Sequence, residues 1–430
     1  MDLFGLTAAQ ETLIVLGVMA VLFVTEIIPL AITSLGGAMA LGLLGVLPMK
    51  QVFSGLSDST VVLFAGMFVI GAALFYTGLA QKIGITVVEH AGHGENRLMV
   101  AVMLVTAIMS SVLSNTGTAA ALLPVVVGIC SVAKIPASKQ LMPMAFAAGV
   151  GGTITMVGTP PNIITVGAMQ AAGLQPFGFF EFAWIGIPLT IVTVLFMMTI
   201  GKRFLPSHEI SAEVNVEQEV TEVSNDTKKM WYSGIILLGV VVAMALESYI
   251  HVPIAISAVI GAILCVLTGC LKEKQAYHSI DWVTIFLFAG MMPVAHAMDV
   301  SGAGKLIADT VVGIMGAHPN PIYATAILFL LSCVLTQFMS NTASCALLAP
   351  IGIAIAQGIN ADPKAVLMAI AIAASCAFAT PVGTPPNTIV LGPGEYRFMD
   401  YVKAGVPLII VCFIVSLIII PIVWPFFPAN

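Results

Sequence analysis

Charged residues are scarce in this chain. Only 8% of its 430 residues are Asp, Glu, Lys or Arg, whereas soluble domains average about 25%. The mean hydropathy is +1.07, and no basic patch of the kind that binds nucleic acid occurs. This composition excludes an ordinary soluble enzyme and predicts a membrane protein, whose spanning segments are helices or a closed barrel.

Motifs for covalent or metal chemistry are also missing. The seven cysteines form no Cys-x-x-Cys pair and no cluster with histidine, so we expect no disulfide framework, metal centre or other cofactor. Neither Gly-x-Ser-x-Gly nor His-Glu-x-x-His occurs, so we expect no intramembrane hydrolase. His296 and Asp299 lie toward the end of one apolar run, and Glu26 lies at the end of another; the sequence leaves their roles open.

Apolar runs of about 20 residues without alternation predict membrane-spanning helices. One polar linker, 205–229, separates a first half, 1–204, from a second half, 230–430. The predicted first-half elements are spans near 10–29, 31–48 and 58–80, a mixed segment at 98–133, and spans near 140–171 and 182–204. The second-half elements are spans near 231–250, 253–271 and 282–300, a mixed segment at 321–359, and spans near 364–393 and 404–425.

Three motifs recur in the same order in both halves, at an offset of about 225 residues. Such agreement indicates an internal repeat. The motifs are Leu-Phe-Ala-Gly-Met at 63–67 and 287–291, Ser-Asn-Thr at 114–116 and 340–342, and Gly-Thr-Pro-Pro-Asn at 158–162 and 383–387.

The two mixed segments decide the topology. They have 36 and 39 residues, including the polar Ser-Asn-Thr motif in the middle, whereas two full spans need roughly 40 apolar residues and a turn. A re-entrant hairpin fits better and leaves five spans per half, an odd number that inverts the second repeat. We therefore expect an all-α polytopic protein with two inverted repeats, about ten spans and two hairpins, a plan used by secondary transporters.

Basic residues test this topology. It puts 12 of the 15 Lys and Arg residues on one face, which the positive-inside rule makes cytoplasmic. The linker is then cytoplasmic, both termini lie outside, and the location is the cell (inner) membrane. The three basic residues of the other face are Lys50, Lys305 and Lys364.

The Ser-Asn-Thr motifs lie at the predicted hairpin tips. Small polar side chains bond their own backbone there and interrupt the helix. The interruption exposes helix N-termini, which attract anions, and carbonyl oxygens, which bind cations such as sodium. One such motif alone is typical of hydrogen bonding between packed helices; two at symmetric positions favour a binding site.

The Gly-Thr-Pro-Pro-Asn motifs each lie within a span. Paired prolines remove backbone donors and disfavour helix before them, so both spans must unwind. Unwound backbone at membrane depth lies within protein or lines a cavity. A plain proline kink explains one proline, but not two identical five-residue breaks.

At these motifs the sequence resembles the divalent anion/sodium symporter family, which includes sodium-dicarboxylate and citrate carriers. The resemblance covers nearly the whole chain and implies a homodimer in which a transport part moves as an elevator against a scaffold. It also implies sodium ions as coupling ions and two sets of site residues. The implied sodium ligands are Ser110, Ser114, Asn115 and Gly158, and in the second repeat Thr336, Met339, Asn341 and Gly383. The implied substrate contacts are Asn115, Thr116, Thr159, Pro160, Ser340, Asn341, Thr342, Thr384 and Pro385.

The leading hypothesis from sequence is sodium-coupled symport of a C4-dicarboxylate: succinate, malate or fumarate. Two alternatives of the same class stay open: sodium-independent exchange of dicarboxylate, citrate or another anion, and sulfate symport. A channel would favour a continuous polar stripe on several helices, whereas polarity here is confined to four symmetric breaks. The sequence therefore favours an occluded site for a small anion within the bilayer.

Overall fold

The computed structural model describes residues 6–90, 94–207, 226–315 and 320–427 of the chain. Within these ranges the regular structure is helical, and no strand occurs. The first half comprises α1 (Ala8–Thr25), α2 (Leu30–Leu43), α3 (Ser59–Tyr76), α4 (Leu79–His90), α5 (Glu95–Ser110), α6 (Asn115–Ala133), α7 (Ser138–Gly152), α8 (Pro160–Ala171) and α9 (Ala183–Thr199).

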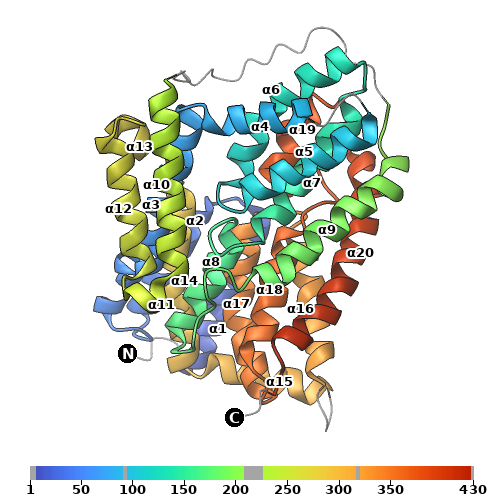
Figure 1. The fold of residues 1–430 in the computed structure, drawn as a ribbon. Helices are drawn as coiled ribbons and strands as arrows, with labels where there is room; N and C mark the ends of the chain where they lie inside the picture. Colours follow the sequence, from blue (N-terminus) through green and yellow to red (C-terminus); the bar gives the residue numbers. More distant parts are fainter. Residues whose placement is uncertain (1–5, 91–93, 208–225, 316–319, 428–430) are drawn as a thin grey trace.

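The second half repeats this order (Figure 1). It comprises α10 (Thr227–Ala245), α11 (Glu247–Ile250), α12 (Ile254–Leu267), α13 (Glu273–Ser279), α14 (Trp282–Val300), α15 (Ala303–Met315), α16 (Pro321–Leu335), α17 (Asn341–Gly358), α18 (Pro363–Ser375), α19 (Pro385–Leu391) and α20 (Phe398–Val423). Seven of the described helices are long and apolar enough to cross a membrane. The all-helical polytopic fold is therefore confirmed.

The predicted interruptions occur at the repeated motifs. α5 and α16 end just before the Ser-Asn-Thr motifs, and α6 and α17 begin at their asparagines. The predicted span 140–171 divides into α7 and α8, and the span 364–393 divides into α18 and α19. That the α5–α6 and α16–α17 hairpins are re-entrant stays a prediction.

Two short helices, α4 and α15, were not predicted from the sequence. The span expected to reach residue 80 ends at Tyr76, and Gly78 takes a positive φ of 79° before α4 begins. Gly302 takes a φ of 76° in the same place between α14 and α15. Glycine adopts this left-handed conformation without steric cost, and it commonly ends helices. Figure 1 shows α4 and α15 at opposite ends of the molecule.

Helices of one half pack against helices of the other. α3 contacts α12, where a β-carbon at Gly66 would lie 2.8 Å from the Ala258 carbonyl carbon. α14 contacts α2 in the same manner, where a β-carbon at Gly290 would lie 2.6 Å from the Ser34 carbonyl carbon. Ser34 also donates a hydrogen bond to the Phe286 carbonyl at 3.2 Å. Glycine thus permits two symmetric close approaches that join the halves.

A similar close approach within the first half gives a test of the packing. We predict that Gly151→Ala destabilises the protein by about 1–3 kcal/mol, the usual cost of overpacking. A β-carbon at Gly151, on α7, would lie 2.4 Å from Ala107 Cα on α5. The control Gly128→Ala has no atom within 4 Å of the new carbon and should be neutral or stabilising, because alanine favours helix by about 1 kcal/mol. Equal melting temperatures for the two purified variants in detergent would contradict the packing.

Candidate functional site

The four helix interruptions line one cavity of about 1060 Å³. Figure 1 shows α8, α14 and α17 close together at the centre of the molecule, and they contact one another there. Ser110 and Thr336 are fully buried behind the cavity wall. The other predicted site residues line the cavity directly: Ser114, Asn115, Thr116, Gly158, Thr159, Pro160, Met339, Ser340, Asn341, Thr342, Gly383, Thr384 and Pro385.

Serine residues form the two hairpin tips. Ser114 is the N-cap of α6, and its hydroxyl accepts a hydrogen bond from the Gly117 N–H at 3.1 Å. Ser340 caps α17 identically and accepts from the Ala343 N–H at 3.1 Å. The caps satisfy one donor each, and the remaining first-turn N–H groups of both helices lie at the cavity wall. The two N-termini therefore bring partial positive charge to it.

Each hairpin asparagine belongs to a cluster of oxygen atoms. Ser110 Oγ donates to the Ala148 carbonyl at 2.8 Å and lies 2.7 Å from Asn115 Oδ1. That Oδ1 position is also 3.0 Å from the Gly158 carbonyl oxygen and 3.2 Å from that of Ala148. The cluster thus combines a hydroxyl from α5, a carboxamide from α6, a carbonyl from α7 and a carbonyl from the unwound segment before α8.

The second repeat reproduces this cluster atom for atom. Thr336 Oγ1 lies 2.7 Å from both Asn341 Oδ1 and the Ala374 carbonyl oxygen. The Oδ1 position lies 3.0 Å from the Gly383 carbonyl oxygen and 3.3 Å from that of Ala374. Either the carboxamide nitrogen occupies this position and donates, or a cation lies among the oxygens. Oxygen-only sets of this kind suit hard cations.

Two asparagines that the sequence analysis left unassigned hold the unwound segments. Asn162 Nδ2 donates to the Thr155 carbonyl at 2.8 Å and to the Gly152 carbonyl at 3.4 Å. Asn387 Nδ2 donates to the Thr380 carbonyl at 2.9 Å and to the Ala377 carbonyl at 2.8 Å. Both asparagines end the repeated Gly-Thr-Pro-Pro-Asn motif, and this repeated position could have identified them from the sequence.

The threonines of the same motif are the N-caps of α8 and α19. Thr159 and Thr384 are extended, with φ of −144° and −151°, and neither side chain caps its helix. Thr159 Oγ1 is buried and has no hydrogen-bond partner among the described residues. Because prolines occupy the next two positions, these ends offer hydroxyl groups rather than a full set of N–H donors.

The rest of the cavity wall is mainly apolar, with phenylalanine side chains from α3 such as Phe64 and Phe68. Glu26 and Asp281 also line it, whereas no Lys, Arg or His does so within the described ranges. Asp281 caps α14 and accepts from the Val283 and Thr284 N–H groups. An anion in this cavity would therefore depend on dipoles, hydroxyls and bound cations for its positive surroundings.

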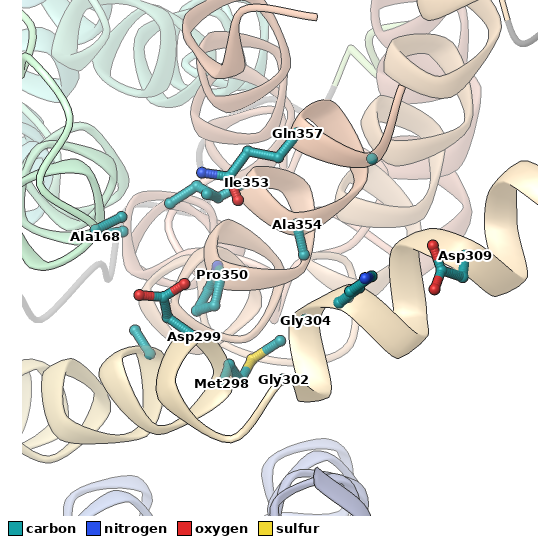
Figure 2. Close-up of a pocket in the computed structure, with 14 residues that line it drawn as sticks. Ala168, Met298, Asp299, Gly302, Gly304, Asp309, Pro350, Ile353, Ala354 and Gln357 are labelled. Carbon is teal, nitrogen blue, oxygen red and sulfur yellow. The ribbon is translucent and has the colours of Figure 1, made fainter. Parts of the chain in front are cut away.

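A second cavity of about 390 Å³ lies at the far ends of α8, α14 and α17, beside α15. Figure 2 shows Asp299 at the end of α14 and Asp309 on α15, with Gln357 on α17 nearby. Asp299 thus lies in this second cavity and away from the four interruptions. His296 lines neither cavity.

Comparison with known proteins identifies the family. The model of the citrate transporter family (CitMHS) matches residues 20–365 and 320–428. The chain belongs to this family. It is 32% identical to an uncharacterised transporter of Haemophilus influenzae, over 95% of this chain and 90% of that protein. It is 26% identical to the sodium-dependent dicarboxylate transporter SdcS of Staphylococcus saprophyticus, over 89% of this chain and 80% of that one.

A solved structure shares the fold. The crystal structure of the Alcanivorax borkumensis YdaH transporter superposes with a TM-score of 0.69 at 16% identity, covering 98% of this chain and 99% of that chain. The family membership confirms the predicted resemblance and establishes a multi-pass membrane transporter of the dicarboxylate/citrate type, and not an enzyme.

The hydrogen bonds from Asn162 and Asn387 to the unwound segments give a second test. We predict that Asn162→Ala and Asn387→Ala each lower the melting temperature clearly, because each leaves two buried carbonyl groups without a donor, at about 1–3 kcal/mol per group. The control Thr199→Val removes only contacts from Thr199 Oγ1 to the Leu195 and Phe196 carbonyls within the last turn of α9, where Thr199 is exposed. If the asparagine variants have the same melting temperature in detergent as this control, the hydrogen bonds of Asn162 and Asn387 do not hold the unwound segments.

Proposed function

We propose that the protein is a sodium-coupled symporter of a C4-dicarboxylate such as succinate, malate or fumarate. The observation that carries this proposal is the pair of matching oxygen clusters at Asn115 and Asn341, each beside a helix N-terminus that faces the shared cavity. One cluster and one N-terminus come from each repeat. Two equivalent half-sites suit a solute with two equivalent carboxylates.

The anion would lie between the two hairpin tips. The N-termini of α6 and α17 supply N–H donors at Asn115, Thr116, Asn341 and Thr342, and anions bind well at such helix ends. Ser340 and the hydroxyls of Thr159 and Thr384 add further donors, while Pro160 and Pro385 form adjoining wall. The same chemistry operates in transporters whose interrupted helices meet at the bilayer midplane.

Sodium would occupy the two oxygen clusters. The first would use Ser110, Ser114, Asn115 and the Gly158 carbonyl, and the second would use Thr336, the Met339 carbonyl, Asn341 and the Gly383 carbonyl. A β-carbon at Gly158 would lie 2.4 Å from the Gly152 carbonyl oxygen. The absence of a side chain at Gly158 therefore lets the Gly158 carbonyl lie close to the cluster. Since the described cavity wall has no basic residue, bound sodium would offset the charge of the anion and couple the two fluxes.

The transport cycle and assembly belong to the same proposal. The two repeats would be inverted, with the linker in the cytoplasm and both termini outside. The protein would be a homodimer in the inner membrane, and its transport part, with the cavity, would move across the bilayer as an elevator. The opposite placement of α4 and α15 in Figure 1 supports the inversion. The 12 to 3 distribution of basic residues supports the orientation.

One observation favours sodium-independent anion exchange as a second candidate. The hydrogen-bonding groups around Asn115 and Asn341 are satisfied without a cation when the carboxamide nitrogens, in place of the oxygens, face the Gly158 and Gly383 carbonyls at 3.0 Å. In that orientation no cation is needed in either cluster. Citrate or another anion would then be exchanged without sodium, and sulfate symport is the remaining alternative for a site of this polarity.

Transport by reconstituted protein separates these candidates. We predict that an inward sodium gradient drives labelled succinate into proteoliposomes that contain no internal dicarboxylate, because sodium and the substrate anion bind together. A potassium gradient of the same size is the control. Uptake that needs internal dicarboxylate and ignores sodium would support exchange, and uptake of sulfate in preference to succinate would support sulfate symport.

Charge substitution tests the site assignment. We predict that Asn115→Asp and Asn341→Asp each reduce succinate uptake by at least about tenfold, the factor that corresponds to roughly 1.4 kcal/mol. A carboxylate at either position would repel the anion. Asn320→Asp is the matched control, because Asn320 caps α16 through its Oδ1 and aspartate caps equally well. Unchanged uptake in the two site variants, with normal folding, would refute the assignment.

A further inference from the structure

A basic cavity lies at the ends of α5, α7 and α9, apart from the site described above. Its volume is about 570 Å³. Four of its lining residues are cationic and one is acidic. The complete lining is Gly94, Glu95, Asn96, Arg97, Lys139, Lys202 and Arg203.

Neutral groups position the two half-buried lysines. Lys139 Nζ donates to the Leu205 carbonyl at 3.2 Å, and Lys202 Nζ donates to Asn96 Oδ1 at 3.5 Å. The ion pair found within the described ranges joins Glu181 and Lys364 elsewhere in the molecule, so the described part gives these cations no carboxylate partner. Counted over the residues that the structure describes, the cavity therefore has a net positive charge.

The first turn of α5 adds to this field. α5 begins at Glu95, and its N-cap Gly94 has no side chain to accept from the first N–H groups. These donors and the positive end of the helix dipole lie beside the four cations. The cavity thus offers both charge and N–H donors to a phosphate group.

An apolar surface leads along α9 to this cavity. Its large exposed side chains recur at helical spacing, including Trp184 at 66%, Ile191 at 52% and Leu195 at 55% exposure. Figure 1 shows α9 on the outside of the molecule, where it packs against α20. Exposed apolar side chains on a helix of a membrane protein suit contact with lipid chains. α9 ends at Thr199, and the short turn that follows it, Gly201–Arg203, carries both Lys202 and Arg203.

We propose that this cavity binds the headgroup of an anionic phospholipid whose acyl chains lie along α9. The cations and helix end account for a phosphate ligand, and the continuous apolar surface favours a lipid over free phosphate. Basic pockets between membrane helices on the cytoplasmic side are known to bind acidic lipid headgroups. The distribution of Lys and Arg along the sequence predicts that same side for all four cations.

The test uses the purified full-length protein in detergent. Phosphatidylglycerol, phosphatidylcholine and inorganic phosphate are each added, and the melting temperature and the lipid retained in native mass spectrometry are measured. We expect phosphatidylglycerol alone to raise the melting temperature, by about 2–4 °C. The double variant Arg97→Gln and Arg203→Gln should lose this shift and the retained lipid.

The matched control is Lys272→Gln with Lys274→Gln, which removes the same charge near the start of α13 and should keep the full response. An equal response to phosphatidylcholine would overturn the proposal, as would a response to inorganic phosphate alone. Retention of phosphatidylglycerol by the Arg97 and Arg203 variant, or its equal loss from the control, would also overturn it.

Discussion

The whole arrangement depends on the need to satisfy backbone polar groups where helices are interrupted inside an apolar protein. In hydrocarbon an unpaired N–H or carbonyl is costly. Asn162 and Asn387 meet part of this need by binding the unwound backbone. The hairpin caps Ser114 and Ser340 meet another part. Other polar groups at the interruptions, among them those of Asn115, Thr159, Asn341 and Thr384, line one cavity, where they are available to a transported solute.

The repeat explains why the leftover groups converge. Each half contributes one hairpin tip, one unwound segment and one oxygen cluster, and the α2–α14 and α3–α12 contacts join the halves. A cavity between two related halves has two related ends. This geometry agrees with membership of the citrate transporter family. In the proposed symporter, the two-fold arrangement of donors would match the two carboxylates of the substrate.

Internal repetition made the interruptions predictable, since only paired motifs could distinguish a binding break from an ordinary helix kink. The glycine-dependent turn at Gly78 was missed, because a glycine within an apolar run does not by itself mark the end of a helix. The predicted end of the corresponding second-half span at residue 300 agrees with the end of α14. The carbonyls of Ala148 and Ala374 were also missed. Their part in the clusters arises from contacts 38 residues apart along the chain, which no local spacing encodes.

Equilibrium binding of radiolabelled sodium to the purified protein, with and without succinate, shows whether the two ligands bind in the same cavity. If both ligands share the cavity, each must strengthen the binding of the other by the same factor. The account predicts tighter sodium binding in the presence of succinate, and loss of this coupling in Ser110→Ala and Thr336→Val. Sodium binding that is absent, or that is indifferent to succinate, would contradict it.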